Sequence, residues 1–196
     1  MRIRSGEHLI SEVRRVAELA LQFGEKELKN LSPEQLNFRP KGGGWSINQV
    51  LAHINSFSSY YNKAFKDRIE STRHDHPKEK YVSSPLGLAQ IKSMKLGKMN
   101  NVRRKLKSPR MHNPAIHPVL EEGDQIAKFM DYQQEMLEIS HEAAEVNLRR
   151  TKIPLAISNR IKLRLGDALI YVSFHVERHL QQIKNIKLDP KYPVGK

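Results

Sequence analysis

The chain has no cysteine among its 196 residues. This absence excludes disulfide bonds, a cysteine nucleophile and sulfur ligands for a metal ion. A tight metal site would therefore have to use histidine and carboxylate side chains. A reaction that needs a thiol would have to take it from a second substrate.

Long apolar runs are missing as well. No stretch approaches the roughly 20 apolar residues that span a bilayer, and no apolar segment near the N-terminus precedes a small-residue cleavage site. We therefore expect a cytoplasmic protein without a membrane partner. A chain of this length is most simply one domain, covering residues 1–196 and large enough for a sizeable core.

Acidic residues are scarce in one part of the sequence. The chain has 34 Lys and Arg against 21 Asp and Glu, a net charge of +13, and residues 73–118 hold eleven basic and only two acidic side chains. Three interpretations are open: a solvated face, a patch for an anionic substrate or cofactor, or a nucleic-acid surface. Nucleic acid is the least favoured, because no helix-turn-helix, zinc-finger or RNA-binding signature accompanies the charge.

Apolar residues recur at helical spacing in four long segments. The spacing predicts helices over residues 5–29, 46–71, 121–148 and 166–186, the second of them capped by Ser46. Prolines and scattered basic residues predict a long connection over residues 73–118, with a short helix near 86–99, and Pro154 begins a linker over 153–164. Because no strand pattern stands out, we expect an all-α fold. The expected architecture is a four-helix bundle with one long crossover connection between the second and third helices.

Two histidines, His175 and His179, lie one helical turn apart in the last predicted helix. Apolar residues share their stripe, so both imidazoles are expected to point inward, at a spacing that lets one helix supply two metal ligands. His53 lies in the apolar stripe of the second predicted helix, about two turns after Ser46. A lone histidine in such a stripe is more often a hydrogen-bonded core residue, so the spacing alone leaves both interpretations open.

Two motifs resemble the DinB-like (YfiT-type) superfamily. The segment 44–53, with Trp45 and Ser46 before the helix and His53 within it, resembles the start of that superfamily's second helix. The segment 175–183 resembles its last helix, which carries a histidine pair followed by a glutamine. The resemblance implies a divalent metal, zinc or nickel, held by His53, His175 and His179 in a four-helix bundle with one crossover.

The resemblance also implies a function. Relatives are described as metal-dependent hydrolases or as thiol-dependent S-transferases, so we expect a small-molecule substrate and a low-molecular-weight thiol as a candidate cosubstrate. Relatives often pair, so a homodimer is expected, although no seam for it is visible in the sequence. The competing interpretation is a non-catalytic helical module that binds an acidic partner or nucleic acid through residues 73–118.

Three imidazoles without a fourth protein ligand are typical of a catalytic metal site, which keeps one coordination position for water or substrate. Gln182, one turn after His179, and Gln49, near His53, are candidates to orient the imidazoles. Glu177 is expected to be rotated off the ligand face, so no carboxylate base is evident.

Overall fold

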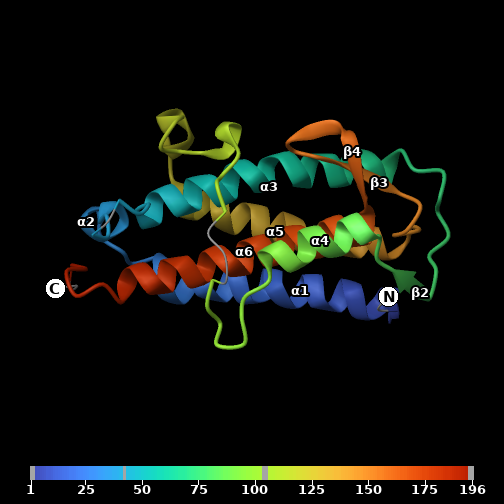
Figure 1. Ribbon diagram of the computed structural model, residues 1–196, viewed down its shortest axis with the longest axis horizontal. Coiled ribbons are helices and arrows are strands. Elements are labelled where there is room, and N and C mark those ends of the chain that lie inside the picture. Colours follow the sequence, from blue (N-terminus) through green and yellow to red (C-terminus); the bar gives the residue numbers. More distant parts are fainter. Residues whose placement is uncertain (1–2, 42, 103–105, 194–196) are drawn as a thin grey trace.

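The computed structural model describes residues 3–41, 43–102 and 106–193, which are mostly helical (Figure 1). Four long helices run along it: α1 (Gly6–Phe23), α3 (Ile47–Glu70), α5 (Gln125–Ala144) and α6 (Leu165–Lys187). Helices α1 and α3 each pack against both α5 and α6. Because α3 and α5 run in the same direction, the connection between them returns along the molecule (Figure 1). No helix in the described ranges is long and apolar enough to cross a bilayer.

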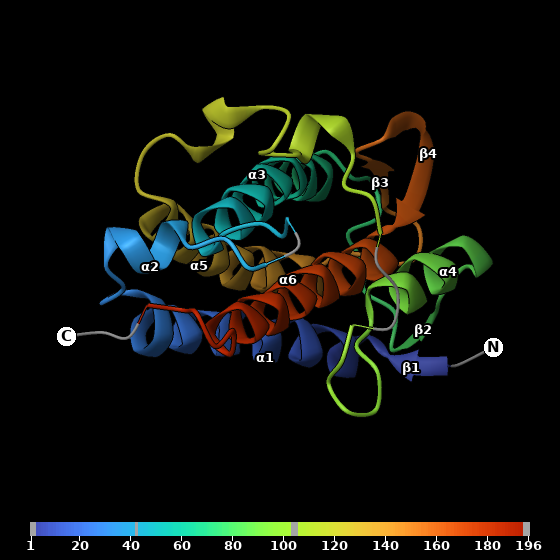
Figure 2. The same cartoon turned by 60° about the vertical axis from the view of Figure 1, so that its left-hand side comes forward.

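Shorter elements gather at the two ends of the long helices. At one end lie η1 (Gly24–Leu28), which continues α1, and α2 (Pro33–Asn37). At the other end β1 (Ile3–Ser5) pairs antiparallel with β2 (Lys80–Val82), and β3 (Lys152–Leu155) with β4 (Ser158–Arg164). Figure 2 shows both strand pairs grouped there with α4 (Pro85–Met94).

Side-chain caps determine where the helices begin. Ser46 accepts the backbone N–H of Gln49, and the Gln49 side chain accepts the N–H of Ser46, which makes a capping box and confirms the predicted start of α3. Asp124 caps α5 through two backbone N–H groups. This helix therefore starts later than expected, and the preceding turn is the separate 3₁₀-helix η3 (Pro118–Glu121).

The expectation of a strand-free linker over residues 153–164 was wrong, because this segment folds as the β3–β4 hairpin. Ile153 and Leu163 pair across the hairpin and are buried, whereas Lys152 and Lys162 on the alternate positions are exposed. Over so few residues this alternation is a weak signal. Pro154 also suggested a break, but the register shifts next to it, and an irregular position of this kind tolerates proline.

The apolar core consists of two clusters that meet near the middle of α3 and α6. One cluster includes Phe57 and Phe174, and the other includes Ile54 and Val176. Complete burial of one such side chain contributes about 1.5–3 kcal/mol. The turns of α3 and α6 at this boundary are thus held from both sides.

Candidate metal centre

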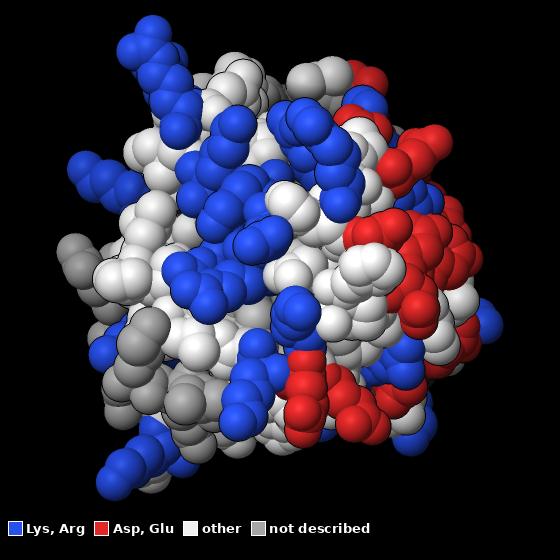
Figure 3. Space-filling model, turned by 90° about the vertical axis from the view of Figure 1, so that its right-hand side faces the viewer, with Lys and Arg blue, Asp and Glu red and all other residues white. Residues whose placement is uncertain are grey.

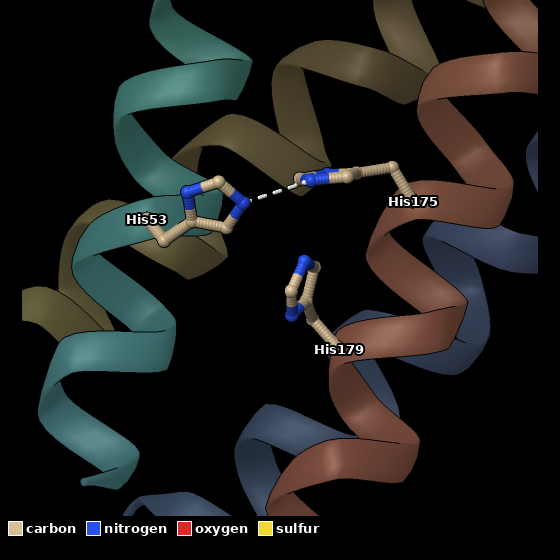
Figure 4. Close-up of side chains that lie close together, drawn as sticks. All are labelled: His53, His175 and His179. Carbon is tan, nitrogen blue, oxygen red and sulfur yellow. Dashed lines mark hydrogen bonds between the residues drawn. The ribbon is translucent and has the colours of Figure 1, made fainter. Parts of the chain in front are cut away.

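Three histidine side chains meet at the boundary between the two apolar clusters (Figure 4). His53 comes from α3, and His175 and His179 come from successive turns of α6. One ring nitrogen from each lies within 4.8 Å of the others, and the ring centroids are 4.5 to 4.9 Å apart. The structure thus brings together the three residues named from the sequence. No other such cluster of histidine and carboxylate side chains is found among the described residues.

Hydrogen bonds hold the outer nitrogens of two of these rings. Nδ1 of His53 donates to the backbone carbonyl of His112 at 2.5 Å, and Nδ1 of His179 donates to Oε1 of Gln182 at 2.8 Å. A donating nitrogen carries the proton of the neutral ring, so Nε2 of each keeps a lone pair for a metal. The ring of His175 is held differently, because it stacks on Phe57 with 4.0 Å between the centroids.

Burial keeps the three imidazoles neutral. Loss of solvation lowers the pKa of His53 to about 4. The same cause, reinforced by the neighbouring imidazoles and by Arg178, lowers the pKa of His175 and His179 well below the ordinary value. All three rings therefore offer lone pairs at neutral pH, which is the protonation state that a metal requires.

The spacing of the donor atoms fits a transition metal. Nε2 of His53 lies 3.0 Å from Nε2 of His175. Two bonds of about 2.0–2.1 Å meeting at a tetrahedral angle would place such atoms roughly 3.3 Å apart. A shift of a few tenths of an ångström would accommodate the ion, so the three residues fit zinc or nickel.

The three histidines line a pocket of about 530 Å³. The Trp45 ring, 5.0 Å from that of His53, lines it too, and the crossover connection supplies one wall with Val102, Leu106, Lys107, Ser108 and Pro109. Two cations lie in the described lining, the exposed Lys107 and Arg178, which is 6% exposed. No Asp or Glu occurs in its described lining, and none of the nine undescribed residues is acidic.

The Gln49 side chain forms no hydrogen bond to His53 among the described residues. The Gln49 side chain accepts from Arg39 and donates to Glu121 at 3.0 Å, besides closing the capping box. Gln49 therefore sets the start of α3, and the carbonyl of His112 orients the imidazole instead. Glu177 lies on the outer face of α6, where it pairs with Arg15 at 3.4 Å.

Sequence reasoning missed two contributors to this site. His112 acts through its backbone carbonyl, for which side-chain identity gives no signal. Arg178 could have been suspected, because it lies between the two histidines of α6, but its place in the pocket lining beside residues of the crossover connection shows only in the folded structure. Of the basic residues in that connection, Arg103, Arg104 and Lys105 lie outside the described residues.

Comparison with known proteins agrees with the geometry. The DinB superfamily matches this chain over residues 25–183, a range that contains all three histidines. The chain is also 30% identical over 163 residues to the uncharacterized protein YuaE of Bacillus subtilis (strain 168). These aligned residues cover 82% of this chain and 88% of YuaE. No solved structure matches the chain significantly. The chain belongs to the DinB superfamily.

Proposed function

We propose that this chain is a metal-dependent enzyme acting on a small molecule, with zinc or nickel held by His53, His175 and His179. The observation that carries the proposal is the convergence of three neutral imidazoles in a pocket of about 530 Å³. The scaffold is one domain, a four-helix bundle of α1, α3, α5 and α6 with a long crossover connection. A divalent ion on three imidazoles supplies Lewis acidity, which lowers the pKa of a water or thiol beside it.

Thiol transfer fits this pocket better than hydrolysis. Water, with a pKa of about 15.7, needs much more help to form its anion than a thiol, with a pKa of about 8.5. No carboxylate is at hand in the described lining to act as a general base for water. Since the chain has no cysteine, the thiol is a low-molecular-weight cosubstrate. The pocket volume lies within the range of about 300–1,000 Å³ that is usual for small-molecule sites.

The residues around the histidines keep the site rigid and partly dry. Gln182 and the carbonyl of His112 fix two imidazole orientations, so that the lone pairs are aimed before any ligand arrives. Phe57 covers one face of the His175 ring, and Trp45 packs beside the His53 ring. A rigid donor set loses little conformational entropy on binding, which favours tight and selective ligation.

The substrate carries an anionic group. Arg178 is almost completely buried and lines the pocket beside the imidazoles, with Lys107 on the exposed side. A guanidinium in such surroundings recognises a carboxylate or phosphate oxygen through charge-assisted hydrogen bonds, and it would orient the substrate against the metal.

Metal analysis of protein purified without a histidine tag tests the proposal. We expect about one zinc or nickel per chain in the wild type, and loss of that metal in His53→Ala and His175→Ala. His76→Ala is the matched control, because the His76 side chain is 91% exposed and lies outside the cluster. Wild-type protein without metal, after expression in medium supplied with zinc and nickel, would refute the proposal.

The reaction is tested by incubating the metal-loaded protein with low-molecular-weight thiols and small electrophiles. Free thiol should be lost faster with the enzyme than without it, and this acceleration should be absent in His53→Ala. Ester and amide hydrolysis measured in parallel separates the two reactions: turnover of these substrates without thiol consumption would mean that the enzyme is a hydrolase. Cytoplasmic location and a homodimer stay predictions.

The competing interpretation, a non-catalytic module acting through residues 73–118, has less support. Part of that connection lines the histidine pocket instead of forming a separate surface. A module of that kind would bind duplex DNA or RNA with steep salt dependence and would keep this binding in His53→Ala. An enzyme of the proposed kind would show neither property.

A further inference from the structure

A second concave site lies at the end of the molecule that carries the strands. It is a hollow of about 360 Å³ where the end of α3 meets the β3–β4 hairpin, lined by Arg68, Ser71, Thr72, Arg73, His74, Arg150, Thr151, Lys152 and Lys162. We refer to it as the basic hollow. The described lining residues of the hollow are all different from those of the histidine pocket. Figure 3 views this end and shows Lys and Arg side chains gathered across it, with acidic side chains crowded to one side.

Basic side chains dominate the basic hollow. Five of its described lining residues are Lys or Arg, and none of the described lining residues is Asp or Glu. None of the five forms an ion pair in the described part of the chain, although Lys63 and Lys66, which are also on α3, pair with Asp67 and Glu135. The described part of the chain thus pairs neighbouring lysines with carboxylates but forms no ion pair with the five cations of the hollow.

The hairpin brings like charges face to face. Lys152 of β3 lies opposite Arg164 of β4, and Lys162 stands two residues before Arg164 on the same face. Cations directly opposite each other destabilise a strand pair. Burial, and then the cations Arg164 and Arg149, lower the pKa of Lys152, while the nearby Asp167 acts in the opposite direction and raises it. A bound anion would relieve this repulsion.

Hydroxyl groups add uncharged donors to the basic hollow. The side chains of Thr72 and Thr151 lie 3.0 Å apart, and Thr72 also accepts the backbone N–H of His74. One hydrogen bond between two hydroxyls uses one of their two hydrogens, so one remains to donate. The lining is therefore rich in donors, and a complementary ligand presents several acceptor oxygens and several negative charges.

We propose that the basic hollow binds a compact ligand carrying two or more phosphate groups. Its five cations exceed what a single carboxylate would neutralise, and phosphate oxygens match both guanidinium and hydroxyl donors. The acidic side chains that flank the patch in Figure 3 would repel an extended polyanion on that side, which favours a compact ligand over a nucleic-acid strand.

Calorimetric titration with inorganic triphosphate tests this inference. We expect one triphosphate per chain for the wild type and an affinity at least about tenfold weaker for the double variant Lys152→Gln/Lys162→Gln, which loses two charge-assisted contacts. The matched control is Lys26→Gln/Lys191→Gln, which removes two exposed lysines at the opposite end of the long helices and should bind like the wild type. Thermal melting shows whether each variant is folded.

Three results would refute the inference. The first is triphosphate binding that is equally strong in the Lys152→Gln/Lys162→Gln variant. The second is an equal loss in the control variant, which would mean a general effect of net charge. The third is binding of a single-stranded oligonucleotide that depends on Lys152 and Lys162 while triphosphate does not bind, because the ligand would then be a nucleic-acid backbone. The histidine pocket plays no part, so the outcome is independent of the proposed enzyme function.

Discussion

Protein without metal is expected to lose stability steeply as the pH falls from about 6.5 towards 4, because three buried imidazoles must then take up protons. In the unfolded chain a histidine has a pKa of about 6.5. In the folded chain burial lowers the pKa of His53 to about 4, and lowers the pKa of His175 and His179 well below the ordinary value. Between these values the unfolded state binds more protons, so the free energy of unfolding falls as the pH falls.

The size of the effect follows from the shift at His53. A pKa of about 6.5 in the unfolded chain and about 4 in the folded chain gives a loss of about 2 kcal/mol between pH 7.5 and pH 5. The contribution is fully present above the unfolded pKa and is lost as the pH falls through the folded one. His175 and His179 act in the same direction, so the whole site loses more than His53 alone.

Urea unfolding in the presence of EDTA, at several values between about pH 7.5 and pH 5, measures this loss. The triple variant His53→Leu/His175→Leu/His179→Leu has no imidazole to titrate at this site. Its free energy of unfolding should therefore fall less than that of the wild type, and the difference should be at least about 2 kcal/mol. Carboxylates and exposed histidines titrate in both proteins, so their contribution cancels in the difference. His76→Ala should follow the wild type. Equal losses in the wild type and the triple variant would show that the imidazoles are not buried as a neutral set.

Three further predictions concern single side chains. Gln182→Leu removes the acceptor for Nδ1 of His179, and metal affinity measured by chelator competition should fall about 10–100-fold, as is typical for lost outer-shell partners. Lys152→Gln removes a cation from a like-charged cross-strand pair, so the free energy of unfolding at low salt should rise by about 0.2–1 kcal/mol. Gly87→Ala would place a Cβ in steric conflict with the carboxylate of Asp167, and denaturant unfolding should show a loss of about 1–3 kcal/mol.

Local chemistry made much of the helical part predictable. Ser46 marks the start of α3 because capping depends on side chains only a few residues apart. The β3–β4 hairpin was not predictable, because its inward-facing residues, among them Ile153 and Leu163, are few and become meaningful only once the helices provide a surface to cover. Strand pairing depends on partners brought together by tertiary structure, and short strands carry little signal of their own.

The candidate site divides in the same way. His175 and His179 were predictable because one helix turn fixes their relation, and His53 because it shares an apolar stripe and a family motif. The carbonyl of His112 was not, because it reaches His53 only through the path of the crossover connection. The place of Arg178 in the pocket lining likewise shows only in the folded structure. Residues that act through tertiary contact need the fold before they can be assigned.

The basic charge of residues 73–118 has a different meaning in three dimensions than along the chain. In the sequence these basic residues form one block, which suggests one surface. In the structure, however, Arg73 lines the basic hollow and Lys107 lines the histidine pocket. At the hollow, Arg73 joins Arg150 and Lys152, which come from a segment that did not stand out for its charge. Binding depends on the charges that converge at one place, not on those that are adjacent in sequence. If the hollow binds phosphate, deleting the later part of the connection should leave that binding intact, whereas neutralising Lys152 and Lys162 should weaken it at least about tenfold.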